Sequence, residues 1–303
     1  MNHHIATILV TGASGFIGRH LLPHLLDADY QVFAYTRHIS QSYKHPNLVW
    51  IDHLDQIMQP LDYVINLAGE NIGQSRWTPA RKQKLIDSRV ETTTHVYDWL
   101  MRQQQKPRRI ISASAIGYYG IDESEKWHKV CDEHSSPQAI FMSELCQKWE
   151  QAALGYTQFD TRIMRLGVVF AKDGGILPQM MLPIKLNLVG KIGSGRQPVV
   201  WVHIQDVLAI LDFLLHTQSE QIIFNAVAPT QTSQADFVKI AGQAIKRRPF
   251  FCAPAFIFQK LLGEQSQLIL NGQYVQPKAL LEAGYTFQFA HLDQALRQIY
   301  SKS

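Results

Sequence analysis

The residues best suited to binding a ligand lie near the start of the chain, where glycine recurs at every third position. The segment VTGASGFIG places Gly12, Gly15 and Gly18 between a short β-rich run and a segment with a helical apolar stripe. Gly12 permits a tight turn, Gly15 lets a pyrophosphate approach the backbone, and Gly18 lets a helix pack closely on a strand. The N-terminus of that helix would offer unpaired N–H groups and the positive end of its dipole. This spacing predicts a dinucleotide-binding turn. Its expected contact residues are Gly12, Ser14, Gly15, Phe16, Ile17 and Gly18.

A second chemical signal stands at the end of the next predicted strand. NAD sites usually place an acidic residue about 20 positions after the glycine turn, where it binds the ribose 2′-hydroxyl. Here the strand is followed by Arg37, and the next acidic residue is Asp52. A guanidinium pairs with a 2′-phosphate, whereas an acidic side chain would repel it. The sequence therefore favours NADP over NAD, with a plain surface role for Arg37 as the alternative.

The elements that must position these residues alternate regularly in the first half of the chain. Short β-rich runs occur at residues 7–10, 31–36, 48–51, 63–67, 109–112 and 161–170. Segments typical of helices lie between them, at residues 16–26, 79–105 and 140–154. Strands that alternate with helices predict a parallel sheet covered on both faces. The expected fold is α/β, a Rossmann-type doubly wound parallel sheet with a smaller C-terminal substrate lobe.

The alternation breaks after Phe170. Residues 174–188 are helix-like and are followed by a glycine-rich segment, and a strand–helix–strand pattern then occupies about 199–227. We therefore expect a nucleotide-binding Rossmann domain over residues 1–170 that also takes in about 199–227. The remainder of residues 171–303 would form a smaller lobe on the substrate side.

The composition excludes several other classes of protein. Of the 303 residues, 46% are hydrophobic and 18% charged, which is typical of a globular chain and not of a disordered or fibrous one. No apolar stretch reaches the roughly 18 residues that a membrane span requires, and Met1–His4 lacks the charged region of a signal peptide. Cys131, Cys146 and Cys252 are an odd number without CxxC spacing, so free thiols are expected. We therefore expect a cytoplasmic protein without a metal site.

The net charge of +4 is distributed over short basic clusters. Among them are Arg81–Lys84, Lys106–Arg109 and Lys246–Arg248. Nucleic-acid-binding proteins more often show one long basic face interleaved with aromatic side chains, so we interpret these clusters as solvated helix ends and loop edges. A modest positive charge still suits an anionic small ligand. The expected partner is a small-molecule substrate, and neither a nucleic acid nor a membrane is expected.

Further motifs carry a resemblance to a known family. In order along the chain they are Asn66–Ile72, Ser88–Thr93, Ala115–Gly120, Arg165–Val169, Gly174–Gly175, Ile192–Gln197 and Trp201–Asp206. Together with the VTGxxGFIG turn, they resemble the atypical extended short-chain dehydrogenase/reductases known as epimerase family proteins. These are similar to NAD-dependent epimerases and dehydratases and carry an uncharacterised C-terminal segment. The resemblance covers nearly the whole chain.

The resemblance implies an NADP-binding Rossmann domain with a C-terminal lobe that closes over a substrate cleft. In such proteins Thr36 and Arg37 would hold the adenosine 2′-phosphate. The remaining implied cofactor contacts are Leu67 and Ala68 after the fourth strand, Arg89 from the long helix, and Val168 at the nicotinamide end. The residues themselves add Gly69, because small side chains after that strand let the backbone approach a cofactor.

The chain departs from the usual chemistry of short-chain dehydrogenases. These enzymes generally combine a Ser with a Tyr-x-x-x-Lys pair, in which the Lys lowers the Tyr pKa. Aligned on Glu150, this chain has Met142 in place of the Tyr and Cys146 in place of the Lys. Val199 likewise replaces the Arg that sugar-nucleotide epimerases direct at a diphosphate, unless Arg196 substitutes for it.

Other groups must therefore supply any proton transfer. Ser114, or alternatively Ser112, would polarise the reacting oxygen, and Tyr118 is the first candidate for proton transfer. The remaining candidates are Tyr119, His203 and Glu70. Each also has a plain structural explanation, since adjacent tyrosines often pack and a histidine can cap a helix start.

Two functions follow from these observations. The first is an NADP-binding oxidoreductase or epimerase-like enzyme that acts on a small organic substrate without the Tyr-x-x-x-Lys pair. The second is a catalytically inactive NADP-binding sensor or scaffold. Met142 and Cys146 favour the second, whereas the retained motifs Gly174–Gly175 and Trp201–Asp206 favour the first.

Overall fold

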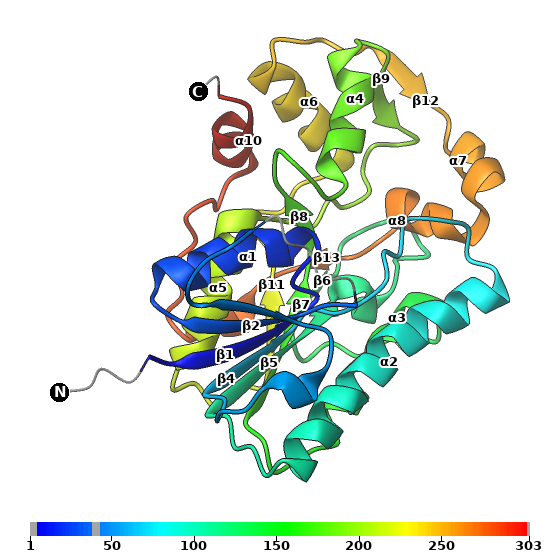
Figure 1. Cartoon of the computed structure of the whole chain (residues 1–303). Helices are drawn as coiled ribbons and strands as arrows, with labels where there is room; N and C mark the ends of the chain where they lie inside the picture. Colours follow the sequence, from blue (N-terminus) through cyan, green and yellow to red (C-terminus); the bar gives the residue numbers. More distant parts are fainter. Residues whose placement is uncertain (1–4, 38–42, 302–303) are drawn as a thin grey trace.

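The computed structural model describes residues 5–37 and 43–301, so Met1–His4, considered above for a signal peptide, lies outside it. A parallel sheet of seven strands forms the centre of the molecule (Figure 1). In spatial order the strands are β11 (Ile223–Ala226), β7 (Thr161–Leu166), β5 (Arg109–Ala115), β4 (Tyr63–Asn66), β1 (Thr7–Thr11), β2 (Gln31–Tyr35) and β3 (Leu48–Ile51). The order reverses at β1, and this reversal is the defining feature of a Rossmann-type sheet. The predicted fold class is confirmed.

Helices cover both faces of the sheet (Figure 1). One face is covered by α1 (Phe16–Asp27) and α5 (Ile204–His216), and the other by α2 (Pro79–Arg102) and α3 (Phe141–Leu154). β1 is buried on both sides, with Ile8 and Val10 packed toward α1 and Leu9 packed toward α2. Burial on both faces explains why β1 is a continuous apolar run instead of an alternating one. Among the described residues, no helix has the length and apolar character needed to cross a bilayer.

The predicted strand over residues 161–170 is divided into two. β7 ends at Leu166, and after Gly167 the chain leaves the main sheet as β8 (Val168–Phe170), which pairs with β10 (Trp201–His203). A Cβ on Gly167 would lie 2.9 Å from the carbonyl oxygen of Val200 and 3.0 Å from Val227. This crowding explains why the chain changes direction at a glycine. The sequence did not reveal the break because both halves are equally β-rich.

The smaller lobe forms around a separate apolar cluster. It packs α4 (Leu177–Lys185), α6 (Gln234–Ala244) and α10 (Leu292–Tyr300) together, and β9 (Val189–Ile192) pairs with β12 (Phe251–Ala253) beside them. The predicted helix over 174–188 is thus shorter than expected. The remaining short elements are η1 (Leu54–Gln56), η2 (Ile116–Tyr119), β6 (Val130–Cys131), α7 (Ala255–Leu262), η3 (Gly263–Ser266), α8 (Gln267–Leu270), β13 (Tyr274–Val275) and α9 (Lys278–Glu282).

A segment near the C-terminus returns to the main sheet. Leu280 and Tyr285 join the apolar cluster formed by α1 and α5. The buried Asp206 carboxylate accepts hydrogen bonds from the Tyr285 hydroxyl at 3.1 Å and from the backbone N–H groups of Gln288 at 2.8 Å and Phe289 at 2.9 Å. Asp206 thereby fixes this segment to the first turn of α5. These hydrogen bonds join Asp206, which belongs to the predicted Rossmann domain, to a segment of the predicted smaller lobe. The division of the chain at residue 170 stays a prediction.

Candidate cofactor and active site

The carboxyl ends of the central strands bring the predicted cofactor residues together. Thr11 at the end of β1 pairs in register with Tyr35 of β2 and with Asn66 of β4. The Thr11 hydroxyl donates to Asn66 Oδ1 at 2.6 Å and accepts the backbone N–H groups of Leu67 at 3.1 Å and Ala68 at 3.2 Å. One buried threonine therefore holds the loop after β4 against the glycine turn.

Two glycines of the turn occupy places that a side chain would obstruct. Gly12 has φ of +65°, and a Cβ there would lie 2.9 Å from the Leu67 carbonyl group. A Cβ on Gly18 would lie 2.4 Å from the carbonyl oxygens of Gly12 and Ala13, which are backbone atoms and cannot move aside cheaply. The predicted roles of these glycines in the turn and in helix packing therefore have a direct geometric cause.

The N-terminus of α1 has the features of an anion-binding site. Gly15 is the N-cap residue, makes no side-chain capping hydrogen bond and is exposed, and the first turn of α1 carries no acidic residue. The first N–H groups of the helix therefore have no side-chain oxygen from the cap, and they concentrate the positive end of the helix dipole. A Cβ on Gly15 would lie 3.0 Å from the Gly12 carbonyl oxygen, so the turn has little room for a side chain at this position. This geometry fits the pyrophosphate of a dinucleotide.

Positive charge gathers at the end of β2. Ser14 and Thr36 lie there with their hydroxyl oxygens 3.0 Å apart. The Arg37 guanidinium, whose side chain is 81% exposed, lies 3.7 Å from Oε1 of Glu70. The same carboxylate accepts a hydrogen bond from Arg81 at 3.0 Å and lies 3.7 Å from Lys84 Nζ.

The charge around Glu70 is not balanced. The hydrogen bond from Arg81 lowers the pKa of Glu70, and the charges of Lys84, Arg81 and Arg37 act in the same direction, so the carboxyl is ionised at neutral pH. Three cations then surround one anion. The surplus positive charge lies beside Arg37 and is suited to a phosphate dianion.

Arg89 supports the loop after β4 and is largely hidden from solvent. Its guanidinium donates to the backbone carbonyls of Leu85 and Glu70, both at 3.0 Å, and lies 5.0 Å from the centre of the Trp149 ring. A Cβ on Gly69 would lie 3.1 Å from this guanidinium. The absence of a side chain at Gly69 therefore lets Arg89 reach the loop. A direct contact between Arg89 and a cofactor stays a prediction.

The glycine pair after β8 packs against Phe16 of the glycine-rich turn. A Cβ on Gly174 would lie 2.4 Å from the Phe16 ring, and one on Gly175 would lie 2.9 Å from it. Val168, the residue predicted at the nicotinamide end, is half-buried in β8, where it pairs with Trp201. The lack of side chains at Gly174 and Gly175 thus leaves space for the Phe16 ring.

Ser114 belongs to a buried polar network. It is 1% exposed, and its hydroxyl donates to Glu150 Oε1 at 2.6 Å. The Glu150 carboxylate also forms a bidentate pair with Arg165, with Nε at 2.8 Å from Oε1 and Nη2 at 2.7 Å from Oε2. Arg165 in turn donates to the Tyr119 hydroxyl at 2.9 Å, and that hydroxyl donates to Asn225 Oδ1 at 2.7 Å. The Ser114 hydroxyl therefore donates its hydrogen bond to a carboxylate of the protein itself.

The two adjacent tyrosines have different environments. The Tyr119 ring is 1% exposed, and burial raises the pKa of its hydroxyl, so it is a poor acid at neutral pH. Tyr118 is half-buried, and the Arg165 guanidinium lies 3.4 Å from the centre of its ring. A cation over an aromatic face is attracted to the ring and fixes its orientation. Of the two side chains, only that of Tyr118 is partly exposed to solvent.

Met142 and Cys146 lie on the face of α3 that packs against η2. A Cβ on Gly117 would lie 3.4 Å from Met142 and 3.7 Å from Cys146 Sγ. The Cys146 thiol donates to the Ala115 carbonyl at 3.4 Å, and burial raises its pKa to about 11. At neutral pH this side chain is therefore a neutral thiol, which supplies neither a cation nor a ready proton.

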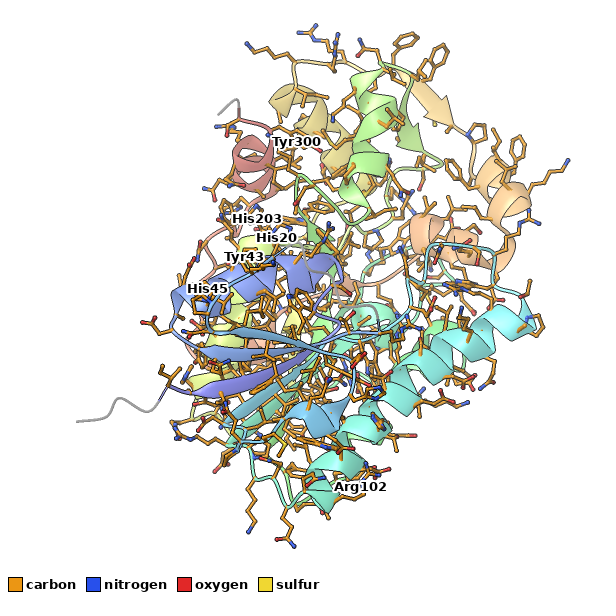
Figure 2. The ribbon with its side chains drawn as sticks, in the orientation of Figure 1. His20, Tyr43, His45, Arg102, His203 and Tyr300 are labelled. Atoms are coloured by element: carbon orange, nitrogen blue, oxygen red, sulfur yellow. The ribbon has the colours of Figure 1, made fainter. Side chains whose placement is uncertain are left out.

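Two other predicted candidates have structural roles. His203 is the N-cap of α5, where its ring nitrogen Nδ1 accepts the Gln205 N–H at 3.2 Å, and its Nε2 lies 3.1 Å from Gln298 Oε1. Its labelled position in Figure 2 is close to His20, on the α1 side of the molecule. Arg196 donates to the Glu125 carbonyl at 2.7 Å. The capping explanation of His203 is confirmed.

Sequence reasoning missed Arg81 and Lys84 as parts of the site, as well as the pairing of Glu150 with Arg165. Arg81 and Lys84 are three residues apart on α2, so they share a face of the helix. This spacing was the available signal, although nothing in it indicated Glu70. No local pattern joined Glu150 on α3 to Arg165 on β7.

Comparison with known proteins agrees with this geometry. Residues 8–226 match the NAD dependent epimerase/dehydratase family, and residues 253–299 match a domain of unknown function, DUF1731. An epimerase family protein of Staphylococcus aureus is 32% identical over 302 residues, which cover 97% of this chain and 99% of that protein.

Two solved structures show the same fold. The human epimerase family protein SDR39U1 (isoform 2), crystallised with NADPH, has a TM-score of 0.87 at 32% identity and covers 97% of this chain and 98% of its own. UDP-glucuronic acid 4-epimerase from Bacillus cereus, in complex with NAD, has a TM-score of 0.74 at 18% identity and covers 97% and 95%. Since the family match and the Staphylococcus aureus relative extend over most of its length, the chain belongs to the NAD dependent epimerase/dehydratase family.

Proposed function

We propose that this protein binds NADP and acts as an oxidoreductase or epimerase-like enzyme on a small organic substrate. The observation that carries the cofactor choice is the surplus positive charge formed by Arg37, Arg81 and Lys84 around Glu70. This positive charge would attract the 2′-phosphate of NADP beside Arg37, whereas the neutral 2′-hydroxyl of NAD would gain little from it. The human SDR39U1 structure contains NADPH, whereas the more distant Bacillus cereus epimerase contains NAD.

The cofactor contacts would divide by chemistry. The turn Gly12–Gly18 and the N-terminus of α1 would hold the pyrophosphate, and Thr36 with Arg37 would hold the 2′-phosphate. Leu67–Gly69 and Val168 would line the rest of the dinucleotide. When bound, the nicotinamide would supply the hydride acceptor or donor, and the protein would position the substrate beside it.

Within this proposal, Tyr118 would transfer the proton and Ser114 would polarise the reacting oxygen. The half-buried ring of Tyr118 under Arg165 supports the first assignment. Ser114 would have to exchange its hydrogen bond to Glu150 for one to the substrate, so the geometry supports it less. Met142 and the neutral thiol of Cys146 support the alternative, an inactive NADP-binding sensor or scaffold.

Calorimetric titration with NADP and NAD tests the cofactor assignment. Each hydrogen bond to a charged group contributes about 1.5–3 kcal/mol, so Arg37→Ala should weaken NADP binding roughly 10- to 150-fold and leave NAD binding nearly unchanged. Lys84→Ala should act in the same direction. Lys82→Ala is the matched control, because Lys82 lies between Arg81 and Lys84 on α2 and its ammonium group pairs with Glu264 at 2.5 Å, not with Glu70. Equal losses for both dinucleotides would overturn the role of Arg37, and lack of binding by either would overturn the function.

Turnover separates the enzyme from the sensor. Reduced NADP mixed with pools of aldehydes, ketones and nucleotide sugars should lose absorbance if the protein is an oxidoreductase, and Tyr118→Phe should abolish that loss while NADP binding persists. An epimerase returns the hydride to its substrate and leaves the absorbance unchanged, so the nucleotide sugars are also incubated with oxidised NADP and analysed for epimerised products. Tight NADP binding without turnover in every pool would favour the sensor.

A further inference from the structure

The outer end of the smaller lobe carries a surface that the proposed function does not use. We define this lobe tip as Leu186–Leu188 together with Lys246–Phe251. The two segments are adjacent, because the Arg248 N–H donates to Asn187 Oδ1 at 3.0 Å and β12 pairs with β9. Figure 1 shows that β9 and β12 lie at the end of the lobe that is farther from the seven-stranded sheet.

The lobe tip exposes large apolar side chains. Phe250 is 75% exposed and Phe251 is 56% exposed, and their ring centres lie 4.3 Å apart. Leu186 at 57% and Leu188 at 51% are exposed beside them. Scattered exposed hydrophobic residues are ordinary, whereas neighbouring aromatic and leucine side chains mark a surface that another phase or molecule covers.

The same surface is strongly cationic. Lys246, Arg247 and Arg248 are all exposed, and neither segment of the lobe tip contains an acidic residue. Three positive charges therefore lie on a few residues, although the whole chain of 303 residues carries a net charge of only +4. Any partner that covers the lobe tip must supply both negative charge and an apolar interior.

We propose that the lobe tip binds the surface of a bilayer that contains anionic lipids. In such an arrangement Phe250, Phe251 and the two leucines would enter the boundary between headgroups and acyl chains, and the three cations would contact lipid phosphates. Phenylalanine rings with adjacent Lys and Arg are a combination typical of interfacial anchors. Leu186 and Leu188 favour a bilayer over a nucleic acid, since aliphatic side chains gain nothing from phosphates or stacked bases. The expectation of no membrane partner rested on the lack of a long apolar stretch, which does not exclude binding at the surface.

Co-sedimentation with vesicles tests the proposal. The full chain should bind vesicles of mixed phosphatidylglycerol and phosphatidylcholine, and it should bind pure phosphatidylcholine vesicles far more weakly. Each basic residue near an anionic surface contributes about fivefold in partitioning, so Arg247→Gln combined with Arg248→Gln should weaken binding about 25-fold. Phe250→Ser combined with Phe251→Ser should remove the part of the binding that survives high salt.

Matched variants at the other end of the molecule serve as controls. Arg102→Gln with Lys106→Gln removes two exposed charges near the end of α2, which Figure 2 shows far from the lobe, and Met58→Ser removes a side chain that is 90% exposed. These should leave vesicle binding unchanged, and thermal unfolding should show that every variant is folded. Equal losses in the control variants would overturn the proposal, as would equal binding to both kinds of vesicle. So would tip-dependent self-association, or oligonucleotide binding without vesicle binding.

Discussion

Breaking the buried ion pair between Glu150 and Arg165 should be the most costly single change in the site. Both side chains are almost wholly buried, at 6% and 1% exposed, and two charge-assisted hydrogen bonds of 2.7 Å and 2.8 Å join them. Arg165→Met leaves the Glu150 carboxylate buried with the Ser114 hydroxyl as its remaining partner in this network. A buried charge that loses its partner costs about 3–5 kcal/mol. This is a large fraction of the roughly 5–15 kcal/mol that stabilises a typical domain.

The double variant distinguishes this reasoning from a simple packing effect. Glu150→Gln should cost a similar amount, because it leaves the Arg165 guanidinium uncompensated. In the combined variant neither charge remains, and the amide oxygen introduced at position 150 would still accept the Ser114 hydroxyl. The total cost should therefore fall short of the sum by about 3 kcal/mol.

Urea unfolding at neutral pH, followed by circular dichroism without cofactor, measures all four free energies. Additivity within about 0.5 kcal/mol would refute the argument, since independent sites add and coupled sites do not. A single variant that costs less than about 1 kcal/mol would refute it as well, because it would show that solvent reaches the pair.

Two further changes test other parts of the structure. Gly18→Ala should reduce both the affinity for NADP and the free energy of unfolding, because the added Cβ would lie 2.4 Å from two backbone carbonyl oxygens. Gly73→Ala is the control, since a Cβ there would lie 3.5 Å from Asn71 Oδ1, an ordinary contact distance. Equal effects of the two substitutions in dinucleotide titrations would contradict this explanation. Burial raises the pKa of Glu133, whose Oε1 accepts the Asn225 N–H at 3.0 Å. Its contribution to stability is therefore full below the unfolded pKa of about 4.3 and is lost as the pH rises through the folded pKa. Glu133→Gln should consequently gain stability relative to the natural chain as the pH is raised, and a difference in unfolding free energy that stays constant with pH would count against it.

The partners of the polar side chains were not predictable from the sequence. Glu70 follows β4, Arg37 follows β2, and Arg81 and Lys84 lie on α2, so their meeting depends on how three elements pack. Ser114 illustrates the same limit. Its position just after the predicted strand 109–112 suggested a substrate contact. The structure extends β5 through Ser114, and the packing of α3 on β5 brings Glu150 to accept the hydrogen bond of the Ser114 hydroxyl.

The lobe tip shows a related limit. Lys246–Arg248 was visible as a basic cluster, and solvated loop edges were the simplest interpretation of it. Phe250 and Phe251 follow those charges directly in the chain, whereas the pairing of β12 with β9 is what brings Leu188 beside them. A cluster becomes a candidate binding surface only through its neighbours in space.

Local sequence patterns were enough to predict the glycine turn between β1 and α1, the doubly wound parallel sheet and the place of Arg37 at the end of β2. These features depend on glycine positions and on the period of apolar residues, both of which are local. The charge cluster around Glu70, the pairing of Glu150 with Arg165 and the approach of Leu188 to the cations of the lobe tip arise only when the elements pack together. Ion pairs and exposed surfaces form between residues distant in the chain, and their strength depends on burial and distance, which no local spacing encodes.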